Sequence, residues 1–271
     1  MGTGIVAGLW MVGMLRSLAP MPADTPTVRL DAAQLAKRLA AASESAPADL
    51  AGVDLSGLDL TGVDFKRANL TGARLAGAKL AGANLFSCDL TDAVASDAVL
   101  TKANMDGTVL RRADFRRADM QGASLFATIL EKTNLGGANL AGTRIIGYLR
   151  SANLAGASLR NSNAGADRGN QSMGVMRATF VGADLSGADL SGANLYKADF
   201  SHATLSGAKL QGANLENADL VQTDFSRADL TDARVAASNI EGADFRGATG
   251  VARLKGLDKA RNRDKAIFDE N

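Results

Sequence analysis

The chain has 271 residues and a formal net charge of +1, and 46% of its residues are hydrophobic although only 4% are aromatic. A charge this close to zero gives no general attraction to nucleic acid or to acidic surfaces. The single cysteine, Cys88, excludes an intramolecular disulfide framework.

The first 26 residues contain an apolar run followed by a linker. The run at residues 4–15, GIVAGLWMVGML, is too short for an unassisted membrane span and has the length of a signal-peptide core. No Lys or Arg precedes it and the cleavage site is loose, so the alternative is an N-terminal helix or tail. We favour an extracytoplasmic location, periplasmic or membrane-anchored, over a cytoplasmic one, with membrane contact only through this segment if it is uncleaved. N-terminal sequencing of native protein tests this, because cleavage after export predicts a start near Ala23 or Asp24, whereas a cytosolic or uncleaved membrane-associated form predicts an intact Met1.

Residues 27–47 predict a short capping helix. Asp31 is a suitable N-cap for a helix over residues 32–42, in which Leu35 and Leu39 lie on one face. An amphipathic helix directly before a repeat region is expected to cover its first coil, because an open end exposes backbone groups and core.

Residues 48–250 repeat a pattern of five residues, seen most clearly from Ala183 to Leu195 as ADLSGADLSGANL. On an α-helix a step of five leaves each Leu about 140° round from the last, and on a strand an odd step alternates between faces. Neither element can bury the pattern. A chain that turns a corner every five residues can, with the Leu or Phe (position i) and the Ala two before it (i−2) inward and the other three positions outward.

Four such sides close a coil of about twenty residues, and stacked coils lie about 4.8 Å apart. Repeats such as residues 68–72 (ANLTG) and 198–201 (ADFS) resemble the pentapeptide-repeat family. The resemblance implies an all-β fold, a right-handed quadrilateral β-helix solenoid. We expect about ten coils, with short helical caps at both ends.

The repeat is interrupted around residues 146–174. After Ile145 the phase changes, Leu154 and Leu159 fall one residue early, and the register returns at Val175. Residues 163–172 are polar and contain no leucine, which predicts a loop. Loops on a rigid scaffold often carry function, and the alternative is an eroded repeat at the surface.

Residues 251–271 leave the repeat and predict a C-terminal helical cap. Leu254, Leu257, Ala260, Ile267 and Phe268 lie among charged residues, which favours one or two short helices over the last coil. In some members of the family a C-terminal segment forms a dimer, so a homodimer contact is the alternative role.

No catalytic, cofactor-binding or metal-binding residue is predicted. The only histidine, His202, takes an outward position without a second metal ligand in reach, and Cys88 takes the inward i−2 position of a core residue. The sequence contains no nucleophile–base set and no phosphate-binding loop. The many Asp residues occupy position i−1, where the repeat places them outward. We therefore expect no enzymatic activity and no cofactor.

The basic cluster of residues 111–117, RRADFRR, invites nucleic acid. Residues twenty apart stack in neighbouring coils, however, so the cluster is expected to be neutralised by cross-coil ion pairs, as are other bases of the repeat. Arg116 alone lacks an acid in register, and no nucleic-acid partner is expected. The predicted pairs are Asp92–Arg112, Asp97–Arg117, Arg111–Glu131, Asp54–Arg74 and Asp59–Lys79, with Lys209 between Asp189 and Asp229.

Outward apolar residues are the better indication of a partner. They collect in the middle coils of the first half, where a contiguous patch would mark an interface; the alternative is tolerated drift. The candidate contacts are Phe86, Val94, Val99, Val109, Phe126 and Ile129.

The sequence favours a non-catalytic scaffold or protein-protein interaction module whose protein partner is unknown. The alternative comes from the resemblance, because some pentapeptide-repeat proteins mimic duplex DNA and inhibit DNA gyrase, conferring quinolone tolerance. Mimicry needs a strongly acidic rod, whereas acids and bases nearly balance here. A supercoiling assay separates the two: a scaffold leaves gyrase unaffected, and a DNA mimic inhibits it.

Overall fold

A computed structural model describes residues 28–43, 45–166 and 176–270. The expected export leader and most of the expected polar loop lie outside the described residues. Within the described ranges, no helix combines the length and the apolar character needed to cross a membrane.

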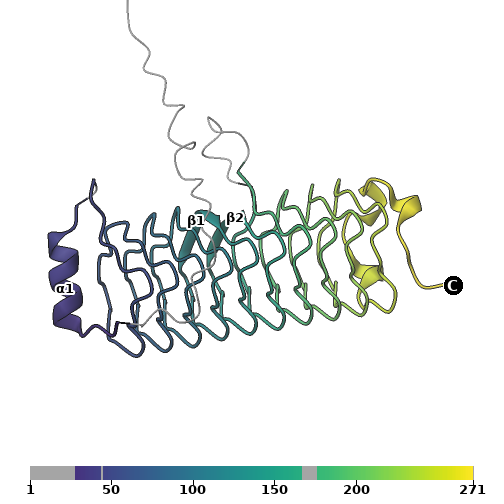
Figure 1. Cartoon of the computed structure of the whole chain (residues 1–271). Helices are drawn as coiled ribbons and strands as arrows, with labels where there is room; N and C mark the ends of the chain where they lie inside the picture. The colour runs from purple at the N-terminus through teal and green to yellow at the C-terminus, as the bar shows by residue number, and fades with distance from the viewer. Residues whose placement is uncertain (1–27, 44, 167–175, 271) are drawn as a thin grey trace, which may run out of the picture.

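The chain winds into a rod of stacked coils (Figure 1). Residues twenty apart form parallel β-bridges, as in the series Asp49, Asn69 and Asp89. The backbone N–H of each inward Leu donates to the next coil, for example from Leu50 to Asn69 O at 2.8 Å and from Leu70 to Asp89 O at 2.7 Å. The β-helix predicted from the five-residue period is confirmed. We name its four sides A to D in chain order, beginning with residues 48–52, 53–57, 58–62 and 63–67.

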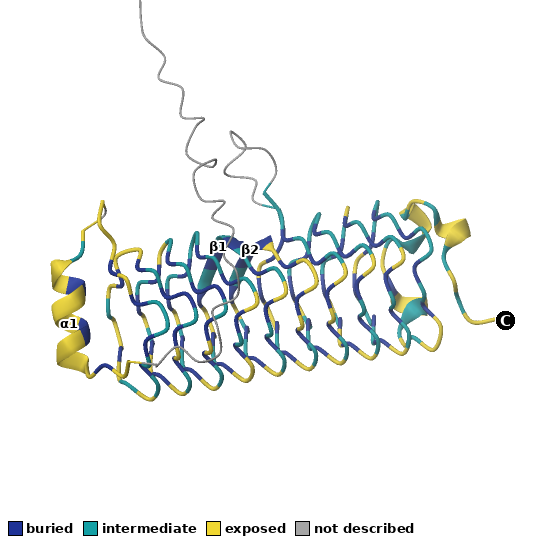
Figure 2. Ribbon diagram, in the orientation of Figure 1, coloured by how far each residue is buried: buried dark blue, intermediate teal, exposed yellow. Residues whose placement is uncertain are grey.

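The core is a narrow column of inward Leu, Phe and Ala side chains. Figure 2 shows that buried residues recur in every coil along the rod. Large residues at position i and small ones at i−2 are almost all inaccessible to solvent. Phenylalanines of neighbouring coils stack: the ring centroids of Phe180 and Phe200 lie 4.5 Å apart, and those of Phe225 and Phe245 lie 5.2 Å apart. Burial of this apolar stack stabilises the rod.

The geometry of each corner accounts for the residue types at positions i−1 and i+2 of the repeat. The Asp or Asn at i−1 accepts a hydrogen bond from the backbone N–H two residues later, as in Ser56 N to Asp54 Oδ1 at 2.9 Å. The residue at i+2 has a positive φ, which suits glycine, for example Gly187 at 64°. Hydrogen bonds from Ser56 lower the pKa of Asp54, and those from Thr231 lower the pKa of Asp229.

The N-terminal helix α1 spans Ala32–Ala41. Asp31 caps it, accepting from Gln34 N at 2.8 Å, while Gln34 Oε1 accepts from Asp31 N at 3.0 Å. Leu35 and Leu39 are buried in the same cluster as the first coils. The ammonium group of Lys66, on side D, donates to Leu39 O at 3.1 Å. These contacts hold the helix against the first coil.

The C-terminal segment contains short helical turns, three rather than the expected one or two. It forms three single 3-10 turns, η2 (Val251–Arg253), η3 (Leu257–Lys259) and η4 (Arg263–Lys265). The bridges Arg234–Lys255, Asn239–Arg261 and Asp244–Ile267 show that this segment is one more coil. Its sides have six residues rather than five, and each 3-10 turn takes up the extra residue.

The predicted interruption at residues 146–174 is narrower in the structure. The coils remain stacked in register on both sides of the phase change, as two side-chain hydrogen bonds show. Asn153 Nδ2 donates to Asn134 Oδ1, 19 residues earlier, and Asn194 Nδ2 donates to Asn163 Oδ1, 31 residues earlier. The first spacing is one residue short of a coil, and the second contains an insertion between Ala164 and Ala178. The early leucines therefore belong to an intact coil.

Ser162 is a buried hydroxyl that the fold does not satisfy. Its Oγ has no hydrogen-bond partner among the described residues, whereas Ser238 Oγ, also inward, donates to Val235 O at 2.6 Å. An unpaired buried hydroxyl costs about 1–3 kcal/mol. We expect Ser162→Ala to raise the free energy of unfolding by about 1 kcal/mol and Ser238→Ala to lower it by about 1 kcal/mol, as measured by urea denaturation. Equal destabilisation by both changes would contradict this assignment.

Candidate protein-interaction surface

In the middle of the rod the corner geometry changes where side D meets side A. Strand β1 (Ser124–Ile129) pairs in parallel with strand β2 (Arg144–Tyr148) across this corner (Figure 1). In β1 the corner residue Ala127 keeps a positive φ of 56°, whereas β2 crosses the corner without any residue of positive φ. Phe126 pairs with Ile146, and after an irregularity Thr128 pairs with Gly147. Strand β2 is thus one residue shorter than strand β1, its partner in the preceding coil.

Gly147 makes the short corner possible. It takes the i−2 position of side A, where other coils have Ala, Cys, Thr or Ser. A Cβ built on Gly147 would collide with the carbonyl oxygen and Oγ1 of Thr128. Because the chain crosses the corner this closely, only glycine fits without displacement.

The missing residue places Tyr148 in register with Ile129, which itself pairs with Val109. All three occupy position i−1 of side A and point outward; Tyr148 is 58% exposed, and Val109 and Ile129 are half-buried. Their spacing along the rod is about 4.8 Å per coil. We call these three residues the apolar column.

The residues of the apolar column replace the usual Asp or Asn of the repeat and thereby lose a hydrogen bond that stabilises the corner. Position i−1 normally carries an Asp or Asn that accepts the corner hydrogen bond, as Asp89 does from Thr91 N at 2.9 Å in the coil before Val109. Val, Ile and Tyr cannot accept this bond with their side chains in that position. Local departures of this kind concentrate at functional sites, so three in succession mark a candidate surface.

Basic residues flank the apolar column at the corner between sides A and B. Arg111 lies 3.6 Å from Glu131, and Arg112 binds Asp92 in a bidentate pair whose hydrogen bonds raise the pKa of Arg112. Lys132 and Arg150 are exposed and form no ion pair within the described part of the chain. These side chains comprise four cations and two carboxylates, which leaves a local surplus of two positive charges.

The six predicted contact residues do not form one surface. Val109 and Ile129 are neighbours on side A, but Val94 lies on side B and Val99 on side C. Phe86 and Phe126 are on side D, two coils apart. Asp106 lies between them and accepts hydrogen bonds from Ser124 Oγ and Phe126 N.

Phe126 is the nearest aromatic residue to the apolar column along the chain, one corner away in β1. It is half-buried, and the guanidinium carbon of Arg144 lies 4.1 Å from its ring centroid. Phe86 is 45% exposed but separate. Phe126 therefore borders the apolar column, whereas Phe86 does not.

The sequence did not single out Tyr148, Lys132 or Arg150 as members of a site. The signal was present in the one-residue shift of Leu149 and Leu154, which shows that this coil has 19 residues and that Tyr148 must stack on Ile129. In the sequence alone, the same shift is also what an interruption of the repeat would produce.

About half of the basic side chains in the described ranges form ion pairs with carboxylates. Arg116, for which no acid in register was expected, binds Asp114 of its own coil at 2.7 Å. The partner of Arg116 therefore comes from its own coil rather than from a neighbouring coil. The predicted cross-coil pairs that reach ion-pair distance are Asp92–Arg112 at 2.5 Å, Asp97–Arg117 at 2.7 Å and Arg111–Glu131 at 3.6 Å.

Other predicted pairs stack in register without closing an ion pair in the described ranges. Asp54 bridges to Arg74 and Asp59 to Lys79, but Asp54 pairs with Arg29 at 3.4 Å instead.

Lys209 likewise lies between Asp189 and Asp229 in the ladder. Asp189 instead binds Arg160 at 3.0 Å, and Asp229 accepts from Gln211 Nε2 at 2.6 Å. Register alone therefore does not decide which charges meet.

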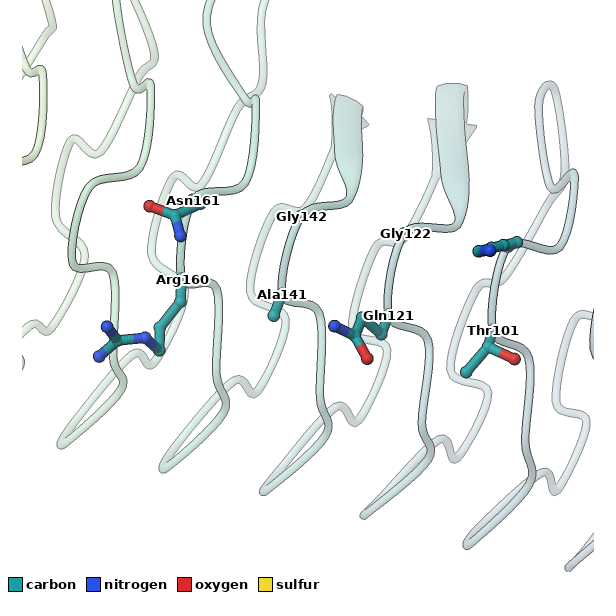
Figure 3. A pocket seen from close by; sticks show the side chains of 8 residues that line it. Thr101, Gln121, Gly122, Ala141, Gly142, Arg160 and Asn161 are labelled. Atoms are coloured by element: carbon teal, nitrogen blue, oxygen red, sulfur yellow. The ribbon is translucent and has the colours of Figure 1, made fainter.

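A shallow groove of about 550 Å³ crosses the corner between sides C and D (Figure 3). Gly122, Ala141 and Gly142 are among its lining residues, together with the cations Lys102 and Arg160. The groove exists because these three residues have little or no side chain. Its lining includes no carboxylate, histidine or cysteine that could act as an acid, base or nucleophile.

In the part of the chain that the structure describes, Cys88 and His202 lie apart, one in the core and one on the surface. Burial raises the pKa of Cys88 to about 12, which keeps its thiol protonated and unreactive. His202 is exposed on side A. Among the described residues, no three His, Cys, Asp or Glu side chains are grouped so that they could hold a metal ion.

Comparison with known proteins agrees with the geometry. A family model described as pentapeptide repeats matches eight copies, at residues 48–85, 88–125, 118–147, 176–212 and 208–247. No curated protein matches the chain.

Solved structures provide further matches. HetL, a pentapeptide repeat protein involved in heterocyst differentiation regulation in the cyanobacterium Nostoc sp. strain PCC 7120, is 29% identical over 88% of this chain and 94% of its own, with a TM-score of 0.47. QnrB1, a plasmid-mediated fluoroquinolone resistance protein, is 18% identical over 79% of this chain and 90% of its own, with a TM-score of 0.35. A pentapeptide repeat protein of the Arabidopsis thaliana thylakoid lumen is 23% identical over 71% of this chain and 68% of its own, with a TM-score of 0.15.

Proposed function

Because this chain belongs to the pentapeptide-repeat family, whose model matches more than half of it, we propose that it is a non-catalytic scaffold that binds a protein partner through the apolar column. The scaffold is a right-handed quadrilateral β-helix of about ten coils. Helix α1 covers its first coil, and the widened coil with η2, η3 and η4 covers its last.

One observation carries this proposal: Val109, Ile129 and Tyr148 stack outward in three successive coils, at a position where the fold itself favours Asp or Asn. A rigid rod keeps these side chains in place before the partner arrives, so little conformational entropy is lost on binding. Exposed aromatic residues are enriched at protein interfaces, and tyrosine in particular contributes to binding energy.

DNA mimicry, the alternative that the family resemblance implies, has no comparable support. A DNA mimic presents rows of unpaired acidic groups, whereas Asp92, Asp97 and Asp114 of this rod are each bonded to an arginine. The likeness to QnrB1, at 18% identity, concerns the fold alone.

Site-specific photo-crosslinking in the native host tests the proposal. A photoreactive phenylalanine analogue is placed at Tyr148 in one variant and at Phe86, an exposed aromatic residue on another side, in the control variant. We expect a discrete crosslinked product from position 148 only, and its loss when Ile129→Ser is added. No product at position 148, or equal products at both positions, would rule out the apolar column as the contact surface.

A further inference from the structure

The backbone around the apolar column offers no edge for a partner strand. Ile129 N donates to Thr108 O at 3.0 Å, and Ile129 O accepts from Leu110 N at 2.7 Å. Tyr148 O accepts from Leu130 N at 2.8 Å, and Leu149 N donates to Thr179 O at 2.7 Å. Addition of a strand requires unpaired backbone groups. A partner must therefore be recognised by its side chains.

The spacing of the apolar column suits an α-helix lying along the rod. Val109, Ile129 and Tyr148 are separated by about 4.8 Å per coil, so they lie at about 0, 4.8 and 9.6 Å. Residues 0, 3 and 7 of a helix lie on one face at about 0, 4.5 and 10.5 Å along its axis. Each apolar side chain of such a helix would meet one member of the apolar column.

The charges beside the apolar column specify the polar flank of that helix. Lys132 and Arg150 both lie at the corner that ends side A, in adjacent coils, and neither has an ion-pair partner in the described ranges. The neighbouring carboxylates of Asp92 and Glu131 are already bound to Arg112 and Arg111. Acidic residues on one flank of the helix would complement the two cations, which sets its orientation and selects against basic sequences.

We propose that the apolar column binds an amphipathic α-helix of a partner protein, with apolar residues at positions 0, 3 and 7 and acidic residues on the flank facing Lys132 and Arg150. This inference rests on the proposed function and names the class of partner. The contact covers only three coils, so the interface is small and its affinity falls in the micromolar range typical of transient complexes, about 1–100 μM.

Fluorescence anisotropy with a defined probe tests this inference. The probe is a labelled helical peptide with Leu at positions 0, 3 and 7 and Glu along one flank, and the control peptide carries Lys in place of Glu. We expect the full-length protein to bind the acidic peptide and not the basic one. Tyr148→Ser should abolish binding, whereas Phe86→Ser should leave it unchanged.

Reversal of the two positive charges beside the apolar column provides a second test in the same peptide-binding assay. The double variant Lys132→Glu, Arg150→Glu should weaken binding of the acidic peptide about tenfold and allow the basic peptide to bind. Retention of acidic-peptide binding by this variant or by Tyr148→Ser would overturn the inference. So would binding to anionic phosphatidylserine vesicles in place of the peptide, which would assign the cations to a membrane surface. If crosslinking at position 148 succeeds and the peptide fails, the partner is not an acidic helix but the apolar column remains a contact surface.

Discussion

Replacement of Phe200 by alanine is expected to lower the free energy of unfolding by about 3–5 kcal/mol. Phe200 is inaccessible to solvent, and its ring stacks on Phe180 with the centroids 4.5 Å apart. The surrounding coils cannot collapse into the cavity, because backbone hydrogen bonds fix their separation: Phe180 N donates to Asp199 O at 2.6 Å and Phe200 N to Asp219 O at 2.7 Å. The truncated side chain therefore leaves most of its volume empty.

Urea denaturation followed by circular dichroism measures this effect. The matched control is Phe86→Ala, which removes a ring that is 45% exposed; we expect it to change the free energy of unfolding by less than about 0.5 kcal/mol. Solenoid stability is approximately a sum over coils and their interfaces, so the loss at Phe200 is also expected as faster amide exchange in the flanking coils. Similar destabilisation by the two changes would show that the rod interior relaxes around the cavity.

Gly147→Ala is expected to lower the free energy of unfolding by about 1–3 kcal/mol, the usual cost of overpacking. Alanine is the commonest residue at i−2 of this repeat, so the repeat pattern alone would make the change harmless. In the structure the added Cβ meets the carbonyl oxygen of Thr128, and the carbonyl carbon behind it at 3.2 Å, which are backbone atoms with little freedom to move. The short corner would have to open.

The control for this change is Gly136→Ala, on side B of the preceding coil. Gly136 also lacks a positive φ, and a Cβ there would come no closer than 3.3 Å, to the side-chain oxygen of Asn134. We expect a change of less than about 0.5 kcal/mol for this variant. Because the short corner sets the position of Tyr148, Gly147→Ala is also expected to reduce crosslinking from position 148. A Gly147→Ala protein as stable as the control would show that the corner adapts.

The regular part of the fold was predictable because the five-residue period is local and repeated. Once a corner follows every five residues, Leu190 must point inward and Asp189 outward, and both do. The twenty-residue coil then brings Asp92 to Arg112, which bind each other at 2.5 Å. Charge pairing within a coil was not predictable in the same way, since the choice of Arg116 for Asp114 depends on side-chain rotamers rather than on register.

The candidate site depended on an exception to the period. A single missing residue before Tyr148 looks like a break in the sequence, although the coil absorbs it at one extended corner. The C-terminal coil is a second exception, since its six-residue sides carry three 3-10 turns where the mixed apolar and charged sequence favoured one or two short helices. In both places the backbone ladder to the neighbouring coil outweighs the local pattern.

By itself, the sequence determined the β-helix, its core and the outward place of Val109 and Ile129, because these follow from a period that every coil repeats. Only the tertiary structure decided that Tyr148 completes the apolar column and that Phe86, Val94 and Val99 lie apart from it. The physical reason is that the backbone hydrogen bonds between stacked coils set the register. They position Tyr148 over Ile129 even though the corner directly before Tyr148 is one residue short.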